Sequence, residues 1–178
     1  MTRITNYLDF KNRLGALPLR AQRQLAATFI GEVLDLAKDP RIRHAVEVAA
    51  KGDATAEELA ATHHAVHAIY VESNPQSDLL EMDFARQAAH FVTAACLVSL
   101  SPADSKAAPA HLAQKVAMYC RMARTCSSMR HDDDTPDFSA LGSVVERLVE
   151  GQYRQAEAFE AAQNLGLGVS LVSTGRIG

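Results

Sequence analysis

The sequence contains no tryptophan and only three cysteines, and aromatic residues make up 6% of its 178 positions. The cysteines are odd in number and do not have the spacing of a zinc-binding motif, so they predict neither a disulfide framework nor a structural zinc site. Cys96 lies in the apolar run FVTAACLVSL, where a thiol usually packs as a small hydrophobic group. We therefore expect reduced cysteines and a cytoplasmic protein.

The chain also lacks an excess of positive charge. It has 18 lysines and arginines against 21 aspartates and glutamates, which gives a formal net charge of −3. Nucleic acids and anionic membranes attract basic proteins, so we expect neither as a partner, and a basic protein fits better. Short basic runs at 20–23 and 121–130 have no interleaved aromatic residues, and we interpret them as solvated helix faces.

No long hydrophobic run is present either. The N-terminal stretch MTRITNYLDFKNRL is interrupted by charges, so we expect neither a signal sequence nor a membrane span. Hydrophobic residues make up 48% of the chain and charged residues 22%, which is typical of an ordered globular protein. The length suits one domain, and we assign residues 1–178 to it.

What the chain does have is alanine and helical periodicity along most of its length. These favour helices in the segments 5–14, 20–37, 41–51, 55–73, 83–100, 111–126 and 137–163. Thr5, Asp39 before Pro40, and Thr55 with Glu58 have the pattern of helix N-termini. The sequence predicts an all-α, single-domain bundle of about seven helices with short loops. The tail, residues 164–178, is predicted to be irregular, either extended or partly disordered.

Three of the seven histidines lie in the stretch ATHHAVHAIY, residues 61–70. His63 and His67 are four residues apart, the spacing at which one helix offers two imidazoles to zinc, and His90 could supply a third ligand from another helix. Position 64 is histidine where the zinc-protease motif requires glutamate. We therefore favour histidines that flank an apolar stripe, with no metal and no cofactor. The alternative is a metal-dependent helical enzyme that uses His63 and His67.

An acidic segment, Asp132, Asp133 and Asp134, lies between the last two predicted helices. The stretch DDTPD has the spacing of the magnesium-binding motif of prenyl-transferring enzymes, but Pro136 interrupts the helix that this motif needs, and no second acidic motif follows. Blocks of like charge normally stay in water. We interpret the segment as a solvated loop and assign no catalytic residue.

Several segments match a pattern of small residues on paired helices. They are DPRIRHA, VEVAA and KGDAT in residues 39–55, Glu58 with Leu59, RQAAH in residues 86–90, and AAPAH in residues 107–111, continuing to residue 119. With these segments, the region from residue 30 to residue 124 resembles the helical immunity-protein family found beside bacterial polymorphic toxins. The C-terminal part also resembles an uncharacterised bacterial all-helical family.

The resemblance implies a bacterial, non-catalytic protein that binds a toxin through an exposed surface. Such surfaces combine buried anchors with charge complementary to the partner. The candidate partner-binding residues are then His63 and Tyr70 on the fourth predicted helix, and Asp132, Asp133 and Asp134. Two alternatives stay open, an oligomeric helical scaffold that pairs with copies of itself and a small-ligand binder.

Overall fold

The computed structural model describes residues 3–73, 83–102, 111–129, 131–132, 135–136 and 141–165. In these segments the chain forms seven α-helices: α1 (Tyr7–Ala16), α2 (Leu19–Gly31), α3 (Pro40–Ala50), α4 (Ala56–Glu72), α5 (Phe84–Ser99), α6 (Leu112–Ser128) and α7 (Leu141–Asn164). A 3₁₀ turn, η1 (Leu34–Leu36), follows α2, and β1 (His131–Asp132) pairs antiparallel with β2 (Thr135–Pro136). The predicted all-α bundle is confirmed. The predicted irregular tail lies outside the described residues from residue 166 onward.

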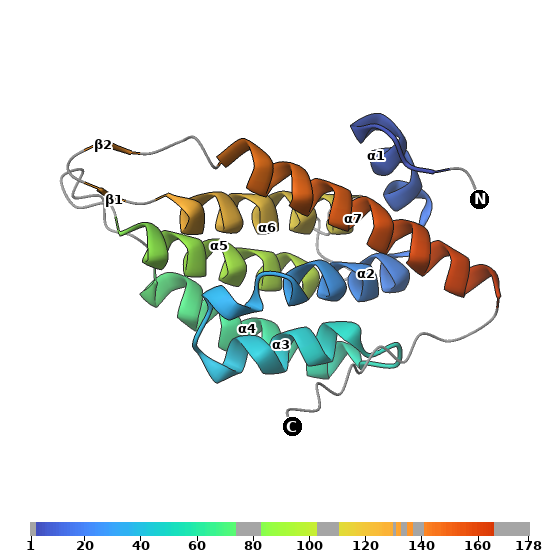
Figure 1. Cartoon of the computed structure of the whole chain (residues 1–178). Coiled ribbons are helices and arrows are strands. Elements are labelled where there is room, and N and C mark those ends of the chain that lie inside the picture. The colour runs from blue at the N-terminus through green and yellow to red at the C-terminus, as the bar shows by residue number, and fades with distance from the viewer. Residues whose placement is uncertain are drawn as a thin grey trace, which may run out of the picture.

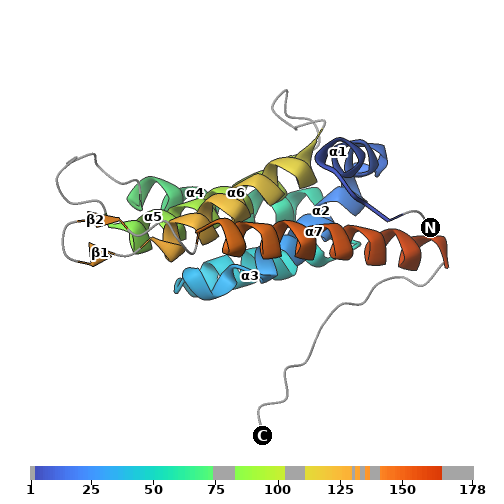
Figure 2. The same ribbon diagram turned by 45° about the horizontal axis from the view of Figure 1, so that its top comes forward.

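The helices pack in layers (Figure 1). α6 and α7 lie on one side, α3 and α4 on the other, and α2 and α5 between them. α1 crosses one end of the bundle beside the start of α6, whereas β1 and β2 lie at the opposite end (Figure 2). This arrangement separates β1 and β2 from the contact between α1 and α6.

Two helix starts follow the sequence signals closely. The side chain of Asp39 accepts a hydrogen bond of 2.9 Å from the amide of Arg41, with Pro40 as the first residue of α3. The hydroxyl of Thr55 accepts one of 3.1 Å from the amide of Glu58. Each interaction satisfies an amide that has no partner within its helix, so both predicted caps are confirmed.

Two boundaries differ from the prediction. Asn6 rather than Thr5 caps α1, because its side-chain oxygen lies 2.9 Å from the amide of Asp9 and it directly precedes the first helical residue. The predicted helix 20–37 is not continuous. It ends at Gly31, and the chain tightens into η1, which leaves Val33 fully buried.

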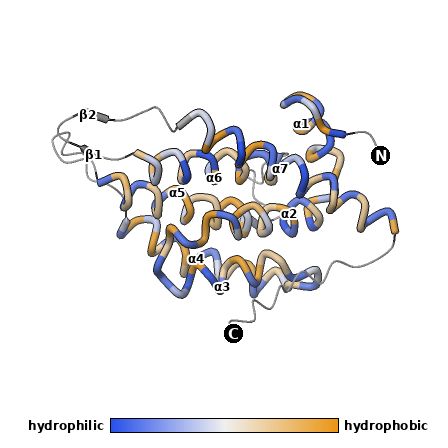
Figure 3. Tube along the Cα trace, viewed as in Figure 1, coloured by the Kyte–Doolittle hydropathy of each residue, from blue (hydrophilic) through white to orange (hydrophobic). Residues whose placement is uncertain are grey.

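The centre of the bundle is the contact between α5 and α6, the most extensive in the molecule. Small residues dominate it on both helices, so the two backbones can approach closely; those that are buried include Ala88, Ala95, Cys96, Ala113, Ala117, Cys120 and Ala123. Figure 3 shows hydrophobic residues along α5 and α2 in the middle of the bundle. Among the described helices, none is both long enough and apolar enough to cross a membrane.

Arg23 corrects the interpretation of the run 20–23 as a solvated face, because its side chain is only 8% exposed. Its Nε and Nη2 atoms each donate a hydrogen bond of 2.9 Å, to the carbonyls of Ser99 and Ser101 at the end of α5. A cation is favourable at a helix C-terminus, where carbonyls lack partners. Burial lowers the pKa of Arg23. Arg23 is therefore a buried link between α2 and α5.

Candidate functional site

The predicted histidine pair lies on α4, with His63 half-buried and His67 exposed. Burial lowers the pKa of His63, and the neighbouring His67 and His64 lower it further. Within the described residues, no three side chains of histidine, cysteine, aspartate or glutamate are placed to hold a metal ion together. The structure therefore does not bring His63 and His67 together with the proposed third ligand, His90.

His90 makes other contacts, between α4 and α5. Its ring stacks on the ring of Tyr70, with centroids 4.4 Å apart, and its Nδ1 atom lies 3.1 Å from the hydroxyl of Ser73. Burial lowers the pKa of His90, and the charge of Arg86 lowers it further. His90 therefore acts as a packing residue, and it covers one face of Tyr70, a predicted partner-binding residue.

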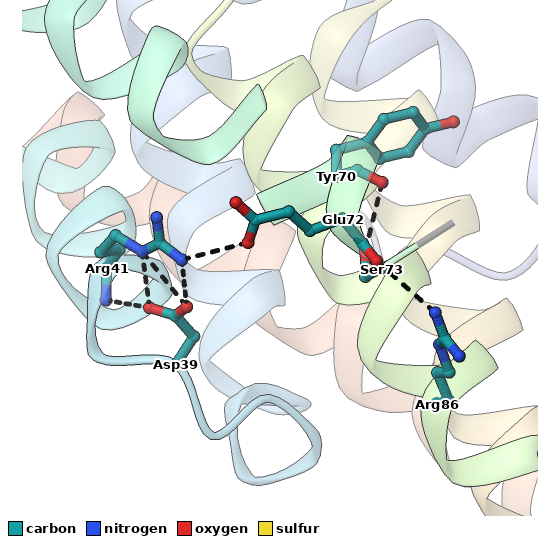
Figure 4. Close-up of polar contacts among 6 residues, drawn as sticks. All are labelled: Asp39, Arg41, Tyr70, Glu72, Ser73 and Arg86. Carbon is teal, nitrogen blue, oxygen red and sulfur yellow. Dashed lines mark hydrogen bonds and ion pairs between the residues drawn. The ribbon is translucent and has the colours of Figure 1, made fainter. Parts of the chain in front are cut away.

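A polar network joins the ends of α3, α4 and α5 near Tyr70 (Figure 4). Arg41 pairs with Asp39 at 2.7 Å and lies 3.7 Å from the carboxylate of Glu72, while Arg86 donates to the carbonyl of Glu72 at 3.5 Å. Each charge in this network has a partner of opposite sign or a carbonyl. It stabilises the junction of the helices rather than presenting an unmatched charge.

The acidic candidates are placed only in part. The backbone of Asp132 lies in β1, where it pairs with Thr135. The side chain of Asp132, and Asp133 and Asp134 entirely, lie outside what the structure describes. Their role in partner binding stays a prediction.

A pocket that the sequence did not predict lies between α1 and α6. Its volume is about 360 Å³, and we call it the α1–α6 pocket; it is lined by Tyr7, Phe10, His111, Gln114, Lys115, Met118 and Arg121. These residues combine aromatic and thioether surface with cationic side chains. Protein interfaces are enriched in tyrosine, methionine and arginine.

Arg121 forms one wall of this pocket, and its guanidinium is held from the side of α7. Its Nε atom donates a hydrogen bond of 2.7 Å to the side-chain oxygen of Gln152, and its guanidinium carbon lies 5.6 Å from the ring centroid of Phe10. Its Nη2 atom is buried and has no hydrogen-bond partner within the described residues. Burial lowers the pKa of Arg121, while Tyr153 and Tyr7 act in the opposite direction. An arginine keeps its proton under such conditions, so a positive charge is held here with little water around it.

Exposed apolar side chains lie at the pocket, where Tyr7 and Met118 line it, and Met122 follows one turn along α6 from Met118. Tyr7 is 51% exposed, Met118 46% and Met122 37%. Met118 and Met122 are four residues apart and share one face of α6, and the side chain of Gln114 donates a hydrogen bond to the Tyr7 hydroxyl. We call Tyr7, Met118, Met122 and the α1–α6 pocket together the α1–α6 face.

A second groove, of about 540 Å³, runs along α7 beside Gly151 and is also bordered by Glu32 and Arg124. Its charges are matched only in part, because Arg147 and Arg154 also line it, are exposed and have no ion pair among the described residues. Arg124 pairs with Asp35 at 2.8 Å, and the carboxylate of Glu32 accepts a hydrogen bond of 2.8 Å from Gln155. The α1–α6 pocket differs because Arg121 is half-buried, and its Nη2 atom is buried without a hydrogen-bond partner among the described residues.

Sequence reasoning missed Arg121, because the run 121–130 was interpreted as a solvated face. The helical pattern did contain a signal. Arg121 follows Ala117 by four residues and directly follows Cys120, and both of these are buried. The position therefore lies at the edge of the buried stripe of α6, where part of a long side chain is covered by neighbouring helices.

The chain matches no family model, no curated protein and no solved structure with which it was compared. The candidate site is therefore assigned from its own geometry. The α1–α6 face combines exposed apolar surface, a pocket and an arginine without a carboxylate partner among the described residues.

Proposed function

We propose that this protein is a non-catalytic, protein-binding module of the immunity type, which acts by covering a surface of a toxin with its α1–α6 face. The observation that carries the proposal is the exposure of Tyr7 and Met118, which line the pocket together with Arg121, and of Met122, one turn along α6 from Met118. Aromatic, methionine and arginine side chains around one concave point are typical of the centre of a protein interface.

The physical argument for a protein partner comes from the apolar part of the face. Exposed tyrosine and methionine side chains gain free energy when a partner removes them from water. Methionine is also flexible, so Met118 and Met122 can adapt to the shape of a partner. The resemblance of residues 30–124 to immunity proteins agrees with this use of an outer surface.

The test is co-expression with a candidate toxin encoded by a neighbouring gene. We expect rescue of growth and a complex that copurifies. Met118→Glu and Met122→Glu should each weaken the complex by about 10- to 100-fold, because each places a charge in an apolar contact. Val71→Glu is the control, since Val71 is also an exposed apolar residue but lies on α4.

The results separate the possible roles of the face. Rescue that persists in both methionine variants rejects the α1–α6 face as the binding surface. The wild-type protein failing to rescue and to form a complex rejects the immunity function. A dimer in gel filtration that dissociates in Met118→Glu would instead assign the face to self-association, the scaffold alternative.

A further inference from the structure

The guanidinium of Arg121 is a charge whose counter-ion is not found in the described part of the chain. Among the described residues, its one hydrogen bond is to Gln152, a neutral side chain, and its Nη2 atom has no acceptor. Removing a cation from water is costly unless an anion or several acceptors replace the water. A ligand that brings a negative charge would complete this site.

The carboxylates at the contact of α1 and α7 have other partners. Asp9 and Glu160 both pair with Arg13, at 3.0 and 3.2 Å. Glu157 accepts a hydrogen bond from the backbone amide of Ile4. These groups hold α1 against α7 and are not directed to Arg121.

The α1–α6 pocket itself has the polarity that an anion requires. No aspartate or glutamate is among its described lining residues, whereas Arg121, Lys115 and His111 are. Lys115 is exposed on the first turn of α6, where amides that lack intrahelical partners also favour negative charge. The pocket is open to the solvent side of the bundle through the α1–α6 face.

We propose that the α1–α6 pocket receives a carboxylate side chain, aspartate or glutamate, of the partner protein, which pairs with Arg121 and Lys115. This inference rests on the proposed function. The Nε atom of Arg121 is bonded to Gln152 and its Nη2 atom is buried, so the Nη1 atom would donate to the carboxylate, and this charge-assisted hydrogen bond is stronger where water is excluded. Arg121 would then be the specificity residue of the interface.

The surroundings favour a protein carboxylate over a free anion. A carboxylate on a protein is accompanied by aliphatic side chains, and apolar surface for these is offered by Tyr7 and Met118 in the pocket lining and by Met122 one turn along α6 from Met118. Once the partner covers these apolar side chains, the ion pair lies in an interface without water, where the attraction between Arg121 and the carboxylate is strongest. The partner surface that fits is therefore an acidic residue within an apolar patch. The net charge of the chain instead led us to expect a basic partner.

The first experiment tests the pocket without a partner. The ¹⁵N-labelled protein is titrated with N-acetyl-glutamate N-methylamide, and with the neutral N-acetyl-glutamine N-methylamide as the matched probe. We expect the acid, and not the amide, to shift the backbone signals of Gln114, Lys115 and Met118, with a dissociation constant in the millimolar range (~1–30 mM), as for a single ion pair. Equal shifts with both probes, or no shift up to about 100 mM, would overturn the inference.

The second experiment uses variants in the same titration. Arg121→Gln should weaken binding of the acid at least about tenfold, and Lys115→Gln severalfold. Lys115 is exposed, so Lys115→Gln tests the pocket even where loss of Arg121 disturbs the fold. Arg147→Gln, an exposed arginine beside the α7 groove, is the control and should leave binding unchanged. Unchanged binding in both pocket variants contradicts the inference.

The complex with the co-expressed toxin separates this inference from the proposed function. If the complex is lost in Met118→Glu but unaffected in Arg121→Gln and Lys115→Gln, the face binds the toxin and no carboxylate enters the pocket. If the glutamate probe binds the pocket but Met118→Glu leaves the complex intact, the pocket stands as a carboxylate site and the α1–α6 face is not the toxin-binding surface.

Discussion

Gln152 holds Arg121 in place from the neighbouring helix α7. Its side-chain oxygen accepts a hydrogen bond of 2.7 Å from Arg121, and its side-chain nitrogen donates one of 3.1 Å to the carbonyl of Ala117. Gln152 is 1% exposed, so both bonds are shielded from water. One neutral side chain of α7 thus orients the cation that faces the α1–α6 pocket.

Replacing Gln152 by leucine should reduce the free energy of unfolding by about 1–3 kcal/mol, because it leaves the Nε of Arg121 buried without an acceptor. Urea denaturation followed by circular dichroism measures the change. Gln155→Leu is the matched control on the same helix. Gln155 donates to the exposed Glu32, so a smaller loss is expected, and equal losses would contradict the role assigned to Gln152.

Arg23→Met should lower the free energy of unfolding by about 1.5–3 kcal/mol, since it removes two charge-assisted hydrogen bonds to the end of α5. Methionine keeps most of the apolar stem of the arginine. Arg20→Met, at an exposed position of α2, should change stability by less than about 0.5 kcal/mol. Denaturant titration of both variants checks this, and a similar effect at the two positions would show that burial of Arg23 contributes nothing.

Stability should fall as the solution is acidified, in part because of His90. The fold lowers the pKa of this imidazole below the ordinary value of 6.5, through burial and then Arg86. The unfolded chain therefore binds more protons than the folded protein below pH 6.5. The free energy of unfolding falls from that pH down through the folded pKa, and His90 has no further effect at lower pH.

Urea midpoints measured at about pH 7.5 and about pH 5 should differ less in His90→Gln than in the wild type, because glutamine does not titrate. His44→Gln, on the exposed side of α3, serves as the control. An unchanged pH dependence in His90→Gln would exclude His90 as a source of the acid sensitivity.

The cysteines should be unreactive in the native protein. Burial raises the pKa of Cys96 to about 12, and it raises the pKa of Cys120 further. At pH values near 8 the thiolate fraction of Cys96 is then about 10³-fold below that of a free thiol. A coloured aromatic disulfide reagent should label Cys96 and Cys120 only after unfolding in urea. Rapid labelling of either in the native state would contradict the burial of the α5–α6 contact.

Gly151→Ala should raise the free energy of unfolding by about 0.5–1 kcal/mol. A Cβ atom at this position meets nothing within 4 Å, and a glycine inside a helix has more conformational entropy to lose on folding than alanine. Thermal unfolding measures the gain. Loss of stability in this variant would show that the glycine is needed for the path of α7.

The sequence predicts the elements of this fold well where the signal is local. Asp39 and Thr55 each cap a helix by accepting a hydrogen bond from an amide two or three residues further along the chain, so the neighbouring sequence is enough to predict this role. The break after Gly31 was missed because the apolar pattern continues to Val33, and only packing of that residue decides the chain path.

The candidate site could not be predicted in the same way. Arg23 bonds to carbonyls 76 and 78 positions away, and Arg121 bonds to a side chain 31 positions away. Such partners are set by how helices pack, which periodicity does not specify. Conversely, His63 and His67 do share the spacing of two metal ligands on α4, but the ring of His90, the proposed third ligand, contacts Tyr70 and Ser73 instead.

The close contact of α5 and α6 also bears on how this protein can change over evolutionary time. Alanine and cysteine at positions such as Ala95, Ala117 and Cys120 leave no spare volume between the two helices. An enlarged side chain on one helix can be accepted only together with a reduced one across from it. Substitutions in the contact between α5 and α6 should therefore occur as linked pairs.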